Sequence, residues 1–298
     1  MKRKYTSFDW AKNKLPRRKK DANKGNYGRL FAYVGSSMYP GAAHLALEAA
    51  LRAGVGYVEV GASGELKKTL LLKFPETIFK DFKEASALTD SDIERLVSEQ
   101  RRATATLVGC GSGRSENLFK IISGLLSEDG GTLVLDADAI NSMAEKKGKA
   151  LELLKKAKRK VILTPHPLEF SRLTGLDASC INENREVCAA KFAREHGCIL
   201  VLKGNGTVIT DGNEVYINTT GSSALAKAGS GDTLAGLLAA LAATTVLPPL
   251  ITSALAACVH GSAGDRLAKE FSEYGVTPSD LPKEMARVLA EIEECNVI

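Results

Sequence analysis

The sequence predicts an α/β fold in which a mostly parallel central sheet is flanked by helices on both faces, in three α/β/α layers. Short, nearly continuous apolar runs alternate along the chain with amphipathic helical stretches, and strands of that kind are buried on both faces of a parallel sheet. Glycines and functional side chains follow these runs rather than precede them. Because ligands bind outside the carboxyl ends of strands in open α/β sheets, we expect a cleft at that edge.

The expected elements follow one another in a repeated strand–helix order. The first unit is a strand at 30–34, a helix that opens at Pro40 and continues to about 53, and a strand at 57–60. Further strands are expected at 104–108, 132–135, 161–163 and 198–202, and helices at 116–126 and 184–196. A hairpin over 208–217, which turns at 211–213, adds an antiparallel edge. No solenoid repeat or low-complexity linker interrupts the chain, so we expect a single domain over 1–298.

The composition is that of a soluble globular protein, with 44% hydrophobic and 25% charged residues. The chain has no run of about 18 apolar residues, which argues against a membrane span, and its N-terminus lacks the apolar core of a signal peptide. The six cysteines form no C-x-x-C pair, and several lie in apolar segments, as reduced cysteines often do. We therefore expect a cytoplasmic protein with no membrane partner.

The positive charge is concentrated in a basic N-terminal arm, residues 1–27. Residues 1–29 carry eleven Lys or Arg and two Asp, whereas the whole chain has a net charge of only +5. A basic arm on a mildly acidic body is not typical of a general nucleic-acid-binding protein, so no nucleic-acid partner is expected. A solvated entry segment is the favoured interpretation, and contact with a polyanionic small ligand or another subunit is the alternative.

The stretch 219–245 runs through the turn Gly229-Ser230-Gly231-Asp232 into an apolar, alanine-rich helix. Glycines allow successive backbone N–H groups to point into one concavity, and the helix N-terminus adds the positive end of its dipole. The pattern predicts an anion cradle with Asp232 inside it. Asp232 is either a helix cap or a general base that takes a proton from a hydroxyl attacking a phosphoryl group. The dipole and N–H groups should favour its ionised form.

Other candidate groups also follow predicted strands. His166 is fixed between two prolines and is expected to contact a ligand. Lys203 and the loop at 204–207 suit phosphate binding and close approach to a nucleotide, although a plain turn explains them equally well. Asp136 and Asp138 could hold Mg²⁺ through water, but capping of the following helix is favoured for Asp138. No motif indicates a zinc enzyme or a serine hydrolase, and no residue is assigned as a direct metal ligand.

Taken together, these motifs resemble the ADP/ATP-dependent NAD(P)H-hydrate dehydratases of the ribokinase-like superfamily. T-P-H-P-L-E-F, followed downstream by K-G-N-G-T and G-S-G-D, is the specific combination. The matching pieces stand in the family's order at 24–28, 40–43, 109–111, 136–141, 164–170, 203–207 and 218–234. The chain departs from the family pattern at Asn23, where His is frequent, at Cys110, where Pro is usual, and at Ser230, where Thr is frequent.

The resemblance implies a hydro-lyase that repairs hydrated NADH or NADPH. ADP or ATP phosphorylates the hydroxyl on the nicotinamide ring, phosphate leaves, and the double bond is restored. The resemblance also implies Mg²⁺ as a helper ion and a homotetramer, and we expect no fused epimerase domain. Asp232 would be the catalytic base, and the hydrated nucleotide would contact Ala42, Gly111 or Gly113, His166 and Asp232. The adenine nucleotide would contact Lys203, Gly204, Asn205, Gly206, Thr207, Asn218, Gly229, Ser230 and Gly231.

Two other functions remain open at this point. A ribokinase-like kinase for a hydroxymethylpyrimidine or thiazole alcohol would release a stable phosphorylated product. A nucleotide-binding regulator on the same scaffold would bind nucleotide without turnover. The motifs do not distinguish ADP from ATP, or NADH hydrate from NADPH hydrate.

Overall fold

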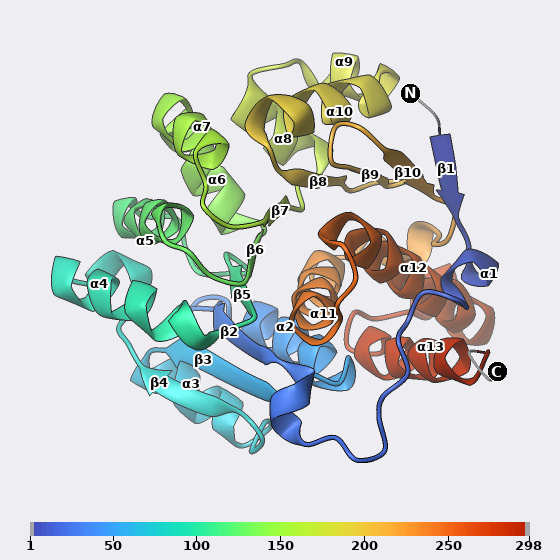
Figure 1. Ribbon diagram of the computed structural model, residues 1–298, viewed down its shortest axis with the longest axis horizontal. Helices are drawn as coiled ribbons and strands as arrows, with labels where there is room; N and C mark the ends of the chain where they lie inside the picture. Colours follow the sequence, from blue (N-terminus) through green and yellow to red (C-terminus); the bar gives the residue numbers. More distant parts are fainter. Residues whose placement is uncertain (1–2, 296–298) are drawn as a thin grey trace.

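The computed structural model describes residues 3–295, which contain one ten-stranded sheet (Figure 1). The strands lie in the order β1-β10-β9-β8-β7-β6-β5-β2-β3-β4. β9 is antiparallel to β8 and β10, and the other neighbouring pairs are parallel. Their bounds are β1 Arg3–Thr6, β2 Arg29–Tyr33, β3 Tyr57–Ala62, β4 Ile78–Asp81, β5 Ala105–Val108, β6 Thr132–Leu135, β7 Val161–Leu163, β8 Ile199–Leu202, β9 Val208–Thr210 and β10 Val215–Asn218. This topology confirms the predicted fold class.

Helices cover both faces of the sheet (Figure 1). One face is packed by α2 Pro40–Arg52, α3 Gly64–Leu71, α11 Ser230–Thr244, α12 Pro249–Gly275 and α13 Leu281–Cys295. The other is packed by α4 Asp90–Glu99, α5 Glu116–Ser127, α6 Asp138–Glu145, α7 Lys147–Lys155, α8 Pro167–Thr174, α9 Ala178–Glu183 and α10 Arg185–His196. In β2, Leu30 belongs to the first core and Phe31 to the second, so alternate side chains are buried on opposite faces. No helix within residues 3–295 is long and apolar enough to cross a membrane.

The helices α2 and α11, which both begin near the carboxyl ends of strands, pack directly against each other. Where they meet, Gly236 lies against Ala46, and any Cβ at position 236 would overlap the Ala46 carbonyl oxygen. Such a close approach of two backbones requires glycine. The contact fixes the start of α11, which carries Asp232, relative to the start of α2, which carries Ala42.

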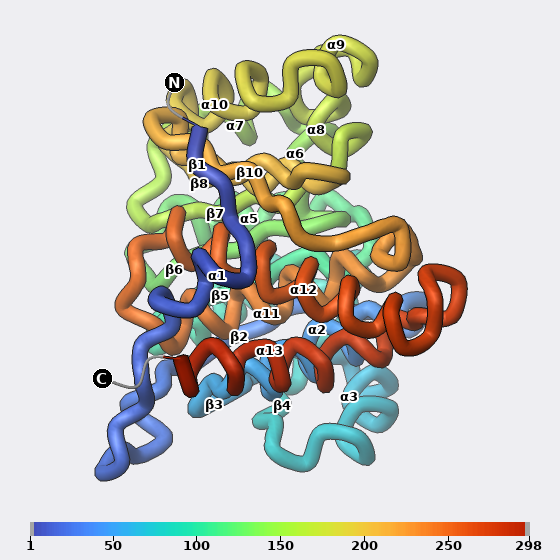
Figure 2. The backbone as a smooth tube through the Cα atoms, turned by 90° about the vertical axis from the view of Figure 1, so that its right-hand side faces the viewer, coloured from blue at the N-terminus to red at the C-terminus, as the bar shows by residue number. Residues whose placement is uncertain are grey.

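The expectation of a solvated entry segment is wrong for residues 3–11. β1 pairs in parallel with β10 and forms the sheet edge that the hairpin was expected to form. The short helix α1 (Phe8–Ala11) follows, with Ala11 buried and Trp10 packed against the core. This N-terminal segment lies beside α12 (Figure 2). Apolar side chains therefore attach the start of the arm to the protein despite its charge, while residues 1 and 2 of the arm lie outside the described residues.

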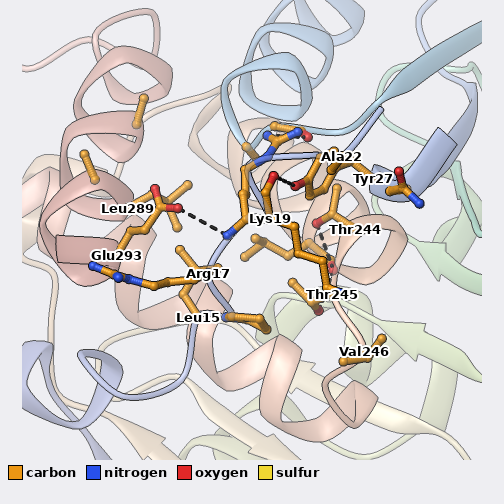
Figure 3. Close-up of a pocket in the computed structure, with 18 of the residues that line it drawn as sticks. Leu15, Arg17, Lys19, Ala22, Tyr27, Thr244, Thr245, Val246, Leu289 and Glu293 are labelled. Atoms are coloured by element: carbon orange, nitrogen blue, oxygen red, sulfur yellow. Dashed lines mark hydrogen bonds between the residues drawn. The ribbon is translucent and has the colours of Figure 1, made fainter. Parts of the chain in front are cut away.

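The rest of the arm borders a cavity at the end of the molecule away from Asp232. Residues between 15 and 27 line this cavity of about 600 Å³ with the C-terminal ends of α2 and α11 and one side of α13 (Figure 3). Because a helix rises about 1.5 Å per residue, Thr244 at the cavity is about 18 Å along α11 from Asp232. A second cavity, also of about 600 Å³, lies at the start of α11.

Candidate active site

The glycine-rich turn forms the start of α11. Gly229 is its N-cap residue and has a φ of 102°, in the left-handed region that favours glycine. No side chain caps the helix, and Asp232 is its third residue, so the capping alternative for Asp232 is wrong. Within residues 3–295, the N–H groups of Gly231 and Asp232 have no hydrogen-bond acceptor. The start of α11 therefore offers unpaired donors to an anion.

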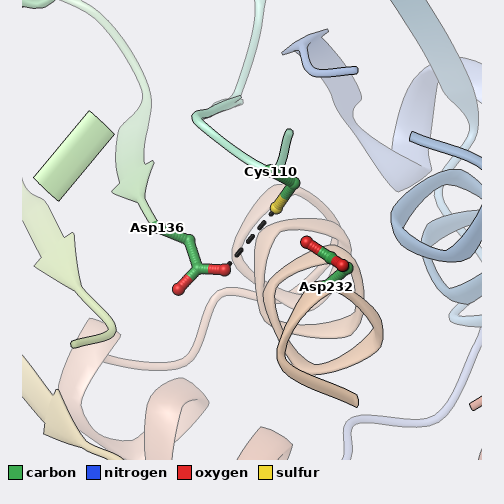
Figure 4. Close-up of side chains that lie close together, drawn as sticks. All are labelled: Cys110, Asp136 and Asp232. Carbon is green, nitrogen blue, oxygen red and sulfur yellow. Dashed lines mark hydrogen bonds between the residues drawn. The ribbon is translucent and has the colours of Figure 1, made fainter. Parts of the chain in front are cut away.

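Asp232 lies beside two side chains that follow β5 and β6. The Cys110 sulfur and one oxygen each of Asp136 and Asp232 all lie within 4.8 Å of one another (Figure 4). Burial raises the pKa of Asp232 to about 7, and the Asp136 carboxylate adds to the increase, while Cys110 and Lys203 oppose it. The helix start was expected to favour the ionised form of Asp232, but burial outweighs that effect and raises the pKa instead. A pKa of about 7 suits a general base that works near neutral pH.

Asp136 anchors a polar network beside Asp232. Its buried carboxylate accepts hydrogen bonds from Lys203 Nζ and Thr164 Oγ1, both at 2.7 Å. The Lys203 ammonium also lies 3.9 Å from Glu169. Burial alone lowers the pKa of Lys203, but Asp136 and Glu169 more than reverse this effect and raise it. The ammonium therefore remains charged although its side chain is only 19% exposed.

The cavity at the start of α11 has the size of a small-molecule site, about 600 Å³. The residues predicted to contact the adenine nucleotide that line it are Lys203, Gly204, Asn205, Thr207, Asn218, Ser230 and Gly231, whereas Gly206 and Gly229 do not. The Asn218 amide is engaged within the protein, since its Oδ1 accepts from Thr6 Oγ1 at 2.8 Å and its Nδ2 donates to the Thr220 oxygen at 2.9 Å. Asn218 thus fixes the wall of the cavity and links it to β1.

The sequence did not predict a role here for His260, which lines this cavity, or for Arg185, which holds one of its loops. Arg185 of α10 donates to the backbone oxygens of Asn205 at 2.7 Å and of Lys203 at 2.9 Å, and so holds the loop at 203–207. An arginine on an amphipathic helix carries no local motif that would reveal this contact. His260 of α12 lines the cavity and lies 3.1 Å from Thr233 Oγ1. Burial lowers the pKa of His260 to about 4, so it is neutral near pH 7.

The predicted substrate-side residues Ala42 and Gly111 meet next to Cys110. Gly111 has a φ of 64°, and a Cβ there would lie 2.7 Å from the Ala42 Cβ. Gly113 has open space beside it and donates its N–H to Asp138 Oδ2 at 2.9 Å. The favoured capping interpretation of Asp138 is therefore wrong, because its carboxylate holds the loop after β5, and α6 has no side-chain cap.

His166 caps the start of α8. Its Nδ1 accepts from the N–H groups of Leu168 at 3.2 Å and Glu169 at 3.3 Å, and its own N–H donates to Glu169 Oε2 at 2.8 Å. Because Nδ1 is an acceptor, the neutral ring carries its proton on Nε2. Burial and the Lys203 charge lower the pKa of His166 and favour that neutral form. The side chain is 43% exposed, and Glu169 and Lys203 link it to Asp136.

The comparison with known proteins identifies the family. A family model described as NAD(P)H-hydrate dehydratase matches residues 32–287. This chain belongs to that family. It is 36% identical over 296 residues to the bifunctional NAD(P)H-hydrate repair enzyme Nnr of Moorella thermoacetica. The aligned region covers 98% of this chain and 55% of that protein. It is 32% identical to the ADP-dependent (S)-NAD(P)H-hydrate dehydratase of Bacillus subtilis, with 94% of this chain and 95% of that protein covered. The chain thus spans about half the length of the bifunctional relative.

Solved structures agree with this assignment. The ADP/ATP-dependent NAD(P)H-hydrate dehydratase from Bacillus subtilis, co-crystallised with ATP and Mg²⁺, matches with a TM-score of 0.83 at 27% identity, over 96% of this chain and 98% of that chain. A ribokinase-like superfamily protein from Enterococcus faecalis gives a TM-score of 0.82 at 27% identity, over 97% of this chain and 96% of that chain. Hydroxyethylthiazole kinase from Pyrococcus horikoshii gives 0.59 at 18% identity, over 89% of each chain, and shares the fold alone. These matches favour the dehydratase family over the vitamin kinases.

Proposed function

We propose that this chain dehydrates hydrated NADH or NADPH with ADP or ATP as phosphoryl donor, as an NAD(P)H-hydrate dehydratase. The observation that carries the proposal is the position of Asp232. Its carboxyl group has a pKa raised to about 7 and stands at the start of α11, where neighbouring N–H groups are unpaired. Membership of the family supports the same reaction. The two features provide a proton acceptor and an anion site at one place.

In the first step, Asp232 accepts the proton of the ring hydroxyl while the hydroxyl oxygen attacks the terminal phosphorus of the nucleotide. The new O–P bond forms as the bond from phosphorus to the leaving phosphate oxygen breaks. The N–H groups of Gly231 and Asp232 and the Lys203 ammonium stabilise the negative charge on the transferred group. In the second step, the ring C–O bond breaks and phosphate departs with its bonding electrons, while the neighbouring ring carbon gives its proton to water and the electrons of that C–H bond form the double bond.

Mg²⁺ is proposed to enter with the nucleotide rather than to occupy a site built from protein ligands. Mg²⁺ prefers oxygen ligands and commonly binds through substrate phosphates and water. The Asp136 oxygens already accept from Lys203, Thr164 and the Cys110 thiol, and a thiol is a poor ligand for this ion. The residues therefore fit an ion that phosphates and waters hold near Asp136. When bound, it would neutralise phosphate charge.

The hydrated nicotinamide is proposed to lie against Ala42, Gly111 or Gly113, His166 and Asp232. Gly111 packs directly against Ala42 at the start of α2, which supports a common contact surface for the ring at these two residues. The Nε2–H of neutral His166, which lies 3.5 Å from Glu169 Oε1, is proposed as a further donor to this group. The adenine nucleotide is proposed to occupy the cavity at Lys203, Gly204, Asn205, Thr207 and Gly231, with Gly206, Asn218, Gly229 and Ser230 supporting its walls.

A hydrate-repair assay tests the proposal. Purified protein is mixed with hydrated NADH or NADPH and with ADP or ATP, and the ultraviolet absorbance of reduced nicotinamide and free phosphate are followed. Recovery of absorbance with equimolar phosphate is expected. A stable phosphorylated product, detected by mass spectrometry with a pyrimidine or thiazole alcohol, would instead support the kinase. Nucleotide binding without turnover of any of these substrates would support the regulator.

We further propose a single catalytic domain, a homotetramer and a cytoplasmic location. The resemblance to the family supports the tetramer, and light scattering of the purified chain tests it. All six cysteines are unpaired, which is typical of proteins in reducing compartments. A measured mass of one or two chains would contradict the tetramer.

A further inference from the structure

The cavity of about 600 Å³ that the N-terminal arm borders is built differently from the candidate active site. It lies between the arm at 15–27, the ends of α2 and α11, and one side of α13. Figure 3 shows Arg17 and Lys19 of the arm around the hollow, together with Thr244 and Thr245 at the end of α11 and Leu289 and Glu293 of α13. Its volume falls within the range of about 300 to 1,000 Å³ typical of small-molecule sites. Neither the proposed chemistry nor the nucleotide cavity uses these residues.

The inner part of this cavity is apolar. Leu241 of α11 and Leu289 of α13 are buried residues in its lining, and Leu15 and Ala286 add partly buried apolar surface. These side chains come from three separate segments of the chain, so the fold, rather than one helix face, creates the surface. An apolar body that covered it would be stabilised by the area removed from water.

The outer part of the cavity is cationic. Four basic side chains and two acidic ones line it, namely Arg17, Arg18, Lys19 and Arg52 with Asp21 and Glu293. Among the described residues, Arg17, Lys19 and Arg52 make no hydrogen bond or ion pair through their side chains. With four basic and two acidic side chains, the lining has a net positive charge. Arg17, Lys19 and Arg52 are available to a ligand.

The helix ends at the cavity do not account for these three cations. Helix C-termini carry partial negative charge and attract basic side chains. Here Arg18 already serves that role, since it donates to the Gly54 oxygen at 3.0 Å and its guanidinium lies 3.5 Å from the Tyr27 ring centroid. At the end of α11, the Thr245 hydroxyl donates to the Leu241 oxygen at 2.8 Å, and Thr104 donates to the Ala243 oxygen at 3.0 Å.

We propose that this cavity binds a small amphipathic anion, with its carboxylate, phosphate or sulfonate at the cationic rim and its apolar body against Leu241 and Leu289. The proposal gives a function to the basic arm, which the candidate active site does not use beyond residue 6. It does not depend on the dehydratase reaction, because the two cavities share no lining residue.

The test uses 1-anilinonaphthalene-8-sulfonate, an amphipathic anion that fluoresces in apolar sites, and the neutral N-phenyl-1-naphthylamine, which has the same rings without the sulfonate. Binding is titrated in excess ADP, which keeps the probe from the nucleotide cavity. The variant Arg17→Gln/Lys19→Gln/Arg52→Gln removes the rim charge. The control Lys155→Gln/Lys158→Gln/Lys160→Gln removes the same charge at exposed positions outside the cavity. Ala290→Phe, at an exposed lining residue of α13, fills the cavity.

The rim variant should bind the sulfonate probe about tenfold more weakly than wild type, because three charge contacts are lost. The control variant should bind it as wild type does, and the neutral probe should not distinguish the three proteins. Ala290→Phe should weaken binding of both probes. Thermal unfolding at the wild-type temperature verifies that each variant is folded. Equal affinity of the rim and control variants for the sulfonate probe, or unchanged binding in Ala290→Phe, would overturn the proposal.

Discussion

The pH at which turnover reaches half of its maximum should depend on the Asp136 carboxylate, because the charge of Asp136 raises the pKa of Asp232. Asp232 must be ionised to accept a proton, so kcat/KM should rise as the pH increases through about 7. The two carboxylates lie within 4.8 Å, and unit charges about 5 Å apart repel by about 3 kcal/mol at an effective dielectric of about 20, or about two pKa units. Because Lys203 offsets part of this repulsion, Asp136→Asn should lower the midpoint by about one to two units.

The assay is a pH profile of kcat/KM for hydrate dehydration, which reports the free enzyme. Asp138→Asn is the matched control, because its carboxylate raises the pKa of Asp232 less than that of Asp136 does, and its midpoint should remain near the wild-type value. Lys203→Met should move the midpoint upward, since the ammonium favours ionised Asp232. An unchanged or raised midpoint in Asp136→Asn would refute the coupling between the two carboxylates.

Three further predictions concern stability and nucleotide affinity. Asp232→Asn should stabilise the fold at pH 8 by about 4 kcal/mol. Because the pKa of Asp232 is raised from 3.8 to about 7 in the folded state, ionisation of Asp232 destabilises that state progressively between these two pH values. Denaturant unfolding should therefore show no increase in the free energy of unfolding at pH 3.5. Arg185→Met should raise the nucleotide KM by about tenfold at nearly unchanged kcat, because the loop at 203–207 loses the hydrogen bonds that Arg185 donates to it. An unchanged KM would show that the loop keeps its conformation without these bonds. Gly236→Ala should destabilise the fold by about 1 to 3 kcal/mol. Gly148→Ala, in helix α7 with open space around it, should not destabilise it. Thermal unfolding of both variants measures the difference.

The sequence predicted eight of the ten strands, all but β1 and β4, and the edge at which functional residues meet. Short, mostly apolar runs predicted strands β6 and β7 with the observed bounds, since strands buried on both faces of a parallel sheet are nearly continuous in apolar residues. The predicted convergence at the carboxyl ends is also observed, because Cys110, Asp136 and Lys203 follow neighbouring parts of one sheet and meet beside Asp232. Whether these residues bind the predicted ligands stays a prediction.

The remaining features depend on tertiary contacts that no local pattern contains. β1 was missed because its four residues are mostly polar and gain their place only by pairing with β10. The direction of the pKa shift of Asp232 was predicted wrongly. The sequence indicates that Asp232 lies at a helix start, but it does not indicate that the carboxylate is buried beside Asp136. Asp138 was assigned as a cap from its place before a helix, although it accepts from Gly113 in a distant loop.

The most direct test of the central claim compares wild type with Asp232→Asn in the hydrate-repair assay, with ADP and with ATP. Wild type should restore reduced-nicotinamide absorbance with release of phosphate, and Asp232→Asn should lose about 10²- to 10⁴-fold in rate while it still binds nucleotide. Asp138→Asn, measured beside it, should retain the wild-type rate within about tenfold. Full activity of Asp232→Asn would contradict the assignment of Asp232 as the base, and inactivity of folded wild type with both nucleotides would contradict the reaction itself.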